Sequence, residues 1–74
     1  MKVTVKLFAS LQENRFIEKV CTCREGTTIQ ILIDELSLPA EQVAIIFINN
    51  THAQKDQAVS NGDRVAFFPP VGGG

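Results

Sequence analysis

The chain has 74 residues, a length that allows one domain with a small core and leaves little room for an enclosed catalytic pocket. Seven basic and eight acidic residues give a formal net charge of −1 without a basic stripe, which argues against binding to nucleic acid. Neither an apolar run of membrane-spanning length nor a signal-peptide pattern occurs in the sequence. We therefore expect a cytoplasmic carrier, binding or subunit protein that contacts neither nucleic acid nor membrane.

Two β-strands are expected at the start of the chain. Residues 2–8 alternate between polar and apolar side chains, and the core-facing positions of this half-buried strand are Val3, Val5 and Leu7. Residues 9–14 form a polar connection that is too short for an element of its own. Residues 16–22 are expected to form the second strand of a hairpin.

The two cysteines, Cys21 and Cys23, lie at the end of this second strand. Positions i and i+2 of a strand share a face, so the two thiols could lie side by side. A structural zinc ion usually needs about four ligands, and only His52 could add to the pair. A disulfide between residues this close would be strained. We therefore interpret both residues as reduced thiols and expect no metal site.

A capped helix follows the hairpin. Thr27 is the expected N-cap, and Gln30 three residues later completes a capping box. The buried stripe of the helix, with the spacing i, i+3, i+4 and i+7, comprises Ile29, Leu32, Ile33 and Leu36. The residues expected in solvent are Asp34 and Glu35. Because Pro39 forbids further helix, the element should end around Ser37.

A continuously apolar run, residues 43–48, indicates a third strand that is covered on both faces. The helix can cover only one of these faces. An Asn49-Asn50 turn should lead into a hairpin with short, weak strands in the polar stretch 51–56.

The last strand is expected at residues 64–68, after a turn in which Gly62 is suited to a positive φ angle. Pro69-Pro70 ends this strand, because proline cannot donate a hydrogen bond to a sheet. Together the elements predict an α+β fold, with a mixed sheet of four to five strands packed on one main helix. Residues 1–70 would form this domain.

The last four residues, Val71-Gly72-Gly73-Gly74, are expected to form a flexible tail (71–74). Taken alone, terminal glycines indicate a flexible end or a linker. In this position they also present a carboxylate with no side chain beside it, on a backbone that can thread a narrow channel. These properties suit a carboxyl terminus that is presented to another protein's active site.

The ending GDRVAFFPPVGGG, from Gly62 to Gly74, resembles that of the MoaD/ThiS family of ubiquitin-like sulfur carriers, and it is most similar to the small subunit of molybdopterin synthase (MoaD). Residues 3–11 are similar to the opening strand and turn of that family, and residues 26–29 to its helix entry. The resemblance spans essentially the whole chain and implies a ubiquitin-like β-grasp fold.

The resemblance also implies a chemistry at the carboxylate of Gly74. An adenylyltransferase of the ubiquitin-activating type, MoeB-like or ThiF-like, would use ATP to adenylate this carboxylate, and a sulfur donor would then replace AMP to leave a thiocarboxylate. The tail would insert into a MoaE-like large synthase subunit, where its sulfur would build the group of molybdopterin that binds molybdenum or tungsten. The chain itself would bind no cofactor. It offers no convincing general base, since His52 is expected on the surface of a polar loop.

Strand parity predicts a docking patch on the outer face of the sheet. Phe8 and Phe68 lie on the faces of the first and last strands opposite the core-facing side chains, and exposed aromatic pairs mark interfaces. We predict that the residues that bind the partner are Phe8, Phe68, Pro70, Val71, Gly72 and Gly73. The alternative is that the two rings cover edge or loop residues of their own domain. The sequence leaves open whether Ile45 and Phe47, or Ile46 and Ile48, face outwards.

Two other functions fit the same sequence. The thiamine-pathway carrier ThiS shares the fold and the Gly-Gly end, but its typical ending lacks the Phe-Phe-Pro-Pro run seen here. A ubiquitin-like protein modifier that forms isopeptide bonds, or a binding module with an inert tail, would also fit.

Overall fold

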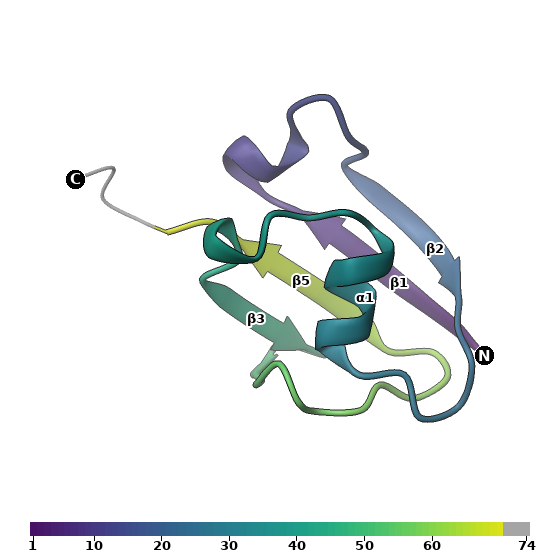
Figure 1. The fold of residues 1–74 in the computed structure, drawn as a ribbon. Coiled ribbons are helices and arrows are strands. Elements are labelled where there is room, and N and C mark those ends of the chain that lie inside the picture. Colours follow the sequence, from purple (N-terminus) through teal and green to yellow (C-terminus); the bar gives the residue numbers. More distant parts are fainter. Residues whose placement is uncertain (71–74) are drawn as a thin grey trace.

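The computed structural model describes residues 1–70, and the predictions on Val71, Gly72, Gly73 and Gly74 lie outside the described residues. Five strands form one mixed sheet in the order β2-β1-β5-β3-β4, and helix α1 lies across one face of it (Figure 1). The bounds are β1 Lys2–Leu7, β2 Glu18–Thr22, α1 Ile29–Glu35, β3 Ile45–Ile48, β4 Thr51–His52 and β5 Arg64–Phe68. The predicted α+β architecture is confirmed.

The centre of the sheet is a parallel pair, β1 and β5, with Val5 opposite Val65. The predicted hairpin of β1 and β2 is antiparallel, and β3 pairs antiparallel with both β5 and β4. Phe8 directly follows β1, and Phe68 is the last residue of β5. Because the two strands run in the same direction, both residues lie at the same end of the sheet. The topology therefore sets two aromatic residues beside the point where the chain leaves the domain.

The core lies between α1 and the sheet, where the predicted alternation is confirmed. The fully buried sheet residues are Val3, Val5, Leu7, Val65 and Phe67, and those of the helix are Ile29, Leu32 and Ile33. The predicted solvent exposure of Asp34 and Glu35 is also confirmed. Each fully buried aliphatic or aromatic side chain contributes roughly 1.5–3 kcal/mol through removal of apolar surface from water. This core packs one face of the sheet against α1. Within the described residues, no helix covers the other face (Figure 1).

The connection after β1 differs from the prediction. It contains a 3₁₀-helix, η1 (Ala9–Gln12), whose Leu11 is fully buried. The Leu11 amide donates to the Phe8 carbonyl at 3.1 Å, which is the i to i+3 bond of such a turn. The short helix forms because it places the one large apolar side chain of the segment in the core.

Both ends of α1 also differ from the prediction. The N-cap is Thr28 rather than Thr27, since the Thr28 hydroxyl accepts from the Ile31 amide at 3.2 Å. The Gln30 side chain donates to Asp34 instead of completing a capping box.

At its C-terminal end the helix stops at Glu35, about two residues before the predicted end. The amide of Leu38 donates to the Ile33 carbonyl and that of Ser37 to the Asp34 carbonyl, with Ser37 at φ 55°. These two bonds form the Schellman motif, which ends the helix before Pro39 does.

The remaining segments agree with the turn predictions. Asn49 and Asn50 both have positive φ, 51° and 65°, and connect β3 to the two-residue strand β4. Gly62 has φ 86° in the turn before β5. A second 3₁₀-helix, η2 (Ala40–Gln42), precedes β3. Among residues 1–70, no helix is long and apolar enough to cross a membrane.

Candidate functional site

The outer face of the sheet, opposite α1, carries the candidate docking surface. The strand pairings put alternate residues of three neighbouring strands on this face: Thr4 and Lys6 of β1, Arg64, Ala66 and Phe68 of β5, and Ile45 and Phe47 of β3. Phe8 continues this face just beyond β1. The face that the sequence left open in residues 43–48 is therefore decided: Ile45 and Phe47 lie outwards, while Ile46 is buried in the core.

Three phenylalanines form an aromatic cluster (Phe8, Phe47 and Phe68) at one end of this face. The rings of Phe8 and Phe68 are stacked, with centroids 4.2 Å apart and an interplanar angle of 13°. Phe47 meets Phe68 edge to face at 5.7 Å. All three rings are half-buried. The structure thus brings the predicted Phe8 and Phe68 together against one another rather than against a loop, and it adds Phe47, which the sequence did not single out.

A shallow hollow of about 180 Å³ lies beside the aromatic cluster, with Phe8 and Phe47 on its wall and Lys6 and Arg64 at its polar side. The Lys6 ammonium nitrogen lies 5.2 Å from the centre of the Phe8 ring, within the range of a cation–π contact. Charged groups around an apolar centre form the rim that docking surfaces usually have.

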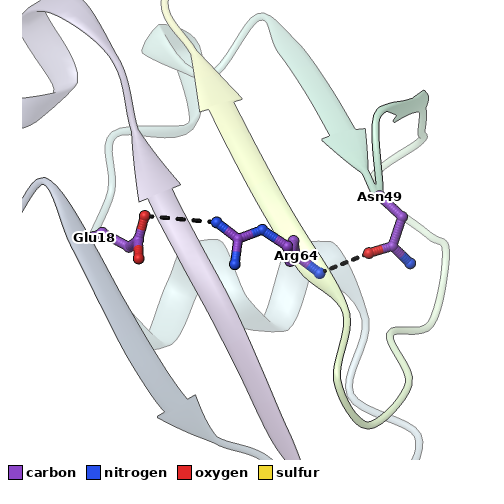
Figure 2. A network of polar contacts seen from close by, with 3 residues as sticks. All are labelled: Glu18, Asn49 and Arg64. Atoms are coloured by element: carbon purple, nitrogen blue, oxygen red, sulfur yellow. Dashed lines mark hydrogen bonds and ion pairs between the residues drawn. The ribbon is translucent and has the colours of Figure 1, made fainter.

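Arg64 of β5 makes polar contacts on both sides, with Glu18 of β2 and with Asn49 in the turn between β3 and β4 (Figure 2). Its guanidinium reaches over β1 to the Glu18 carboxylate of β2 at 3.7 Å, and its backbone amide donates to the Asn49 side-chain oxygen at 2.9 Å. Because both charged side chains are largely exposed, the ion pair contributes about 0–1 kcal/mol at most. Arg64 therefore remains available to a partner's acidic groups.

The chain leaves the sheet at a well-anchored point next to the aromatic cluster. The carbonyl of Phe68 accepts from the Ala44 amide at 2.9 Å, and that of Phe67 accepts from the Phe8 amide at 3.2 Å. Pro69 and the exposed Pro70 follow directly. The sheet therefore holds the chain on both sides as far as Phe68, two residues before the end of the described part.

The titratable groups of the described residues form no catalytic constellation. Cys21 and Cys23 are free thiols, and burial raises the pKa of each above its usual value, so both are protonated at neutral pH. His52 is exposed, as expected, and its ring forms an edge-to-face pair with Phe47, with centroids 5.7 Å apart. Within residues 1–70, no group of three metal-ligating side chains comes together.

A mixed five-stranded sheet on one helix, with a central parallel pair, defines the class of ubiquitin-like β-grasp proteins. A candidate subunit 1 of the molybdopterin converting factor from Pyrococcus furiosus superposes with a TM-score of 0.78 at 28% identity, over 96% of this chain and 99% of that chain. The small archaeal modifier protein 1 of Haloferax volcanii gives 0.77 at 23% identity, with 100% of both chains covered. A chain from the complex of subunits 1 and 2 of the molybdopterin-converting factor from Helicobacter pylori gives 0.66 at 20% identity, again with 100% of both covered.

The sequence places the chain within that class. The model of the ThiS family matches residues 5–74, and the chain belongs to this family. It is also similar to the molybdopterin synthase sulfur carrier subunit of Haemophilus influenzae, with 53% identity over 30 residues. That match spans 40% of this chain and 37% of the length of the Haemophilus protein. The predicted membership of the MoaD/ThiS family is confirmed.

Proposed function

We propose that this chain is a sulfur carrier, the small subunit of a molybdopterin synthase, and that its functional group is the carboxylate of Gly74. The observation that carries the proposal is the aromatic cluster on the open sheet face, at the end of β5 and two residues before Pro70, the last described residue. The similarity to the Haemophilus influenzae sulfur carrier subunit supports the same function. In this function the domain binds a partner, and the tail delivers the reacting group.

Sulfur loading requires activation of the terminal carboxylate, because a free carboxylate is a poor electrophile. In the site of a MoeB-like or ThiF-like adenylyltransferase, a carboxylate oxygen of Gly74 attacks the α-phosphorus of ATP and pyrophosphate leaves. A sulfur nucleophile at the oxidation level of sulfide then adds to the carbonyl carbon, and AMP leaves with its bonding electrons. The product is a thiocarboxylate, and neither step needs a proton-transfer group from the carrier itself.

Docking on a MoaE-like large subunit would position this thiocarboxylate. Phe8 and Phe68 anchor the partner, since aromatic side chains at the centre of an interface carry much of its binding energy. The four residues after Pro70 span at most about 14 Å when extended, so the acceptor site has to open close to the aromatic cluster. The last three residues of the tail are glycines, and a segment without side chains fits a narrow channel at that distance.

Mass spectrometry of the intact chain tests this function. The full chain is incubated with ATP, an adenylyltransferase of the MoeB or ThiF type and sulfide, and we expect one oxygen to be replaced by sulfur. A variant that lacks Gly73 and Gly74 is the control, which should unfold at the same urea concentration and gain no sulfur. Conjugation to lysine side chains would establish a modifier instead, and an unchanged mass would establish an inert tail.

The identity of the pathway is tested by the partner. The loaded chain should bind a MoaE-like subunit and transfer its sulfur to the molybdopterin precursor. Binding to a ThiG-like subunit alone would assign the chain to thiazole synthesis, as a ThiS-type carrier, and would contradict the molybdopterin proposal.

A further inference from the structure

The free edge of β2 has the geometry of a pairing surface. β2 is the last strand on its side of the sheet. The most exposed large apolar side chains of residues 1–70 lie in β2 and just before it, Val20 at 60% and Ile17 at 59%. Such an edge is a template for another strand. Backbone bonds to β1 are made by odd-numbered residues: the Ile17 carbonyl accepts from Leu7 at 2.9 Å, and the Cys23 amide donates to Met1 at 2.8 Å.

The alternation of an antiparallel ladder then determines which groups face outwards. The amides and carbonyls of Glu18, Val20 and Thr22 point away from β1, towards the open side. We infer that two copies of this chain pair antiparallel through β2, about a two-fold axis at Val20, to form one continuous sheet. The occupant of the edge is a second copy because the register and charges of β2 are self-complementary.

The register follows from the length and charges of β2. A centre at Val20 pairs all five residues of the strand: Glu18 lies opposite Thr22, Lys19 opposite Cys21, and Val20 opposite Val20 of the second copy. A centre at Lys19 or Glu18 would oppose identical charges, which destabilises a sheet. A centre at Cys21 would run past the end of the strand. Only the register at Val20 uses the whole edge without a like-charge pair.

Charge complementarity on the outer face favours the same register. The Lys2 ammonium donates to the Thr22 hydroxyl at 2.7 Å, so a positive charge already stands beside Thr22. The pairing brings Glu18 of the second copy opposite this Thr22. Among residues 1–70, the one ion pair of Glu18 is the exposed contact to Arg64 at 3.7 Å. Because of the two-fold symmetry, the dimer contains this Glu18–Lys2 pair twice, each time with one residue from each copy.

The inner face offers a second complementary pair. In this register Lys19 lies opposite Cys21 of the second copy. Within one copy, burial is the main cause that raises the pKa of Cys21; the charge of Lys19 lowers this pKa, and the carboxylate of Glu35 in α1 raises it. The pairing therefore moves a second positive charge towards Glu35 of the other copy. Both faces of the joined strands would carry opposite charges near one another.

The dimer would be weak and would leave the docking surface free. Five residues a side make an interface far below the size of a stable complex, so we expect a dissociation constant on the order of 100 µM. The aromatic cluster lies at the ends of β1 and β5, away from the β2 edge. The dimer would carry two such clusters on one face, and the inference does not depend on the proposed chemistry at Gly74.

Sedimentation equilibrium of the full chain under reducing conditions tests the dimer. Between about 10 µM and about 1 mM, the average mass should rise from monomer towards dimer. Val20→Lys should weaken association roughly tenfold or more, because it sets two ammonium groups across the axis. Ala40→Lys is the matched control, since it adds the same charge at an exposed position of η2 and should leave association unchanged.

Charge-swap variants and amide hydrogen exchange test whether the dimer forms through the β2 edge. Glu18→Lys and Lys2→Glu should each weaken the dimer, and the double variant should restore it. At high concentration the amides of Glu18, Val20 and Thr22 should exchange more slowly than at low concentration. A chain that is monomeric at about 1 mM would overturn the inference. A dimer that survives Val20→Lys, or that Phe8→Ala abolishes, would overturn it as well.

Discussion

Replacing Phe68 with alanine should weaken partner binding strongly and leave the domain folded, whereas the same change at the adjacent Phe67 should remove a large share of the stability. The two rings lie on opposite faces of β5: Phe67 is fully buried, and Phe68 is half-buried in the aromatic cluster. A buried phenylalanine truncated to alanine costs about 3–5 kcal/mol. A domain of 74 residues has about 4–11 kcal/mol in total, so Phe67→Ala removes a large share of it.

Phe68→Ala loses a smaller amount of stability, because only the stacked contact with Phe8 and the edge contact with Phe47 disappear. Two such aromatic contacts amount to about 1–3 kcal/mol. At an interface, loss of an anchoring side chain costs about 2 kcal/mol or more, which corresponds to a dissociation constant raised at least about 30-fold.

Urea unfolding followed by circular dichroism measures the first quantity, and calorimetric titration with a MoaE-like subunit measures the second. Phe16→Ala is the control, because Phe16 is a half-buried phenylalanine outside the aromatic cluster, and its loss should leave affinity unchanged. A folded Phe68→Ala variant that binds as tightly as the wild type would refute the reasoning. So would a loss of stability as large as that of Phe67→Ala.

Three further predictions concern the domain itself. Thr28→Ala should lower the free energy of unfolding by about 1 kcal/mol, since it removes the N-cap bond to Ile31, and an unchanged urea midpoint would contradict this. Gly62→Ala should cost about 1–2 kcal/mol from its φ of 86° alone, because no atom lies within 4 Å of the added methyl group; a neutral result in the same assay would disprove the strain. The raised pKa of Cys21 and Cys23 means that the unfolded chain loses these protons first. Their contribution to stability is therefore complete below about pH 9.0 and is lost as the pH rises above it. Urea titrations at neutral and alkaline pH should show this loss, and the double variant Cys21→Ser/Cys23→Ala should show less of it.

Several features of the fold could be predicted because their signals are local. Alternation in β1 and β5 identified the core face, and the positive φ of Gly62 followed from a turn sequence. The N-cap prediction, Thr27, was wrong by one residue, since Thr27 and Thr28 both have the required hydroxyl. Tertiary contacts decide it: Thr27 is buried, and its carbonyl accepts from the Val59 amide at 2.9 Å. Leu11 was missed because one apolar residue in a polar stretch has no period.

The sequence by itself determined which faces of β1 and β5 are apolar, because the alternation that shows it is a property of consecutive residues. Only the tertiary structure decided that Phe47 joins Phe8 and Phe68, since a uniformly apolar strand has no preferred face until it pairs with β5. The strand order likewise decided that the edge of β2 is open. Strand order arises from pairing between distant segments, and that pairing depends on how the whole core packs rather than on any local pattern.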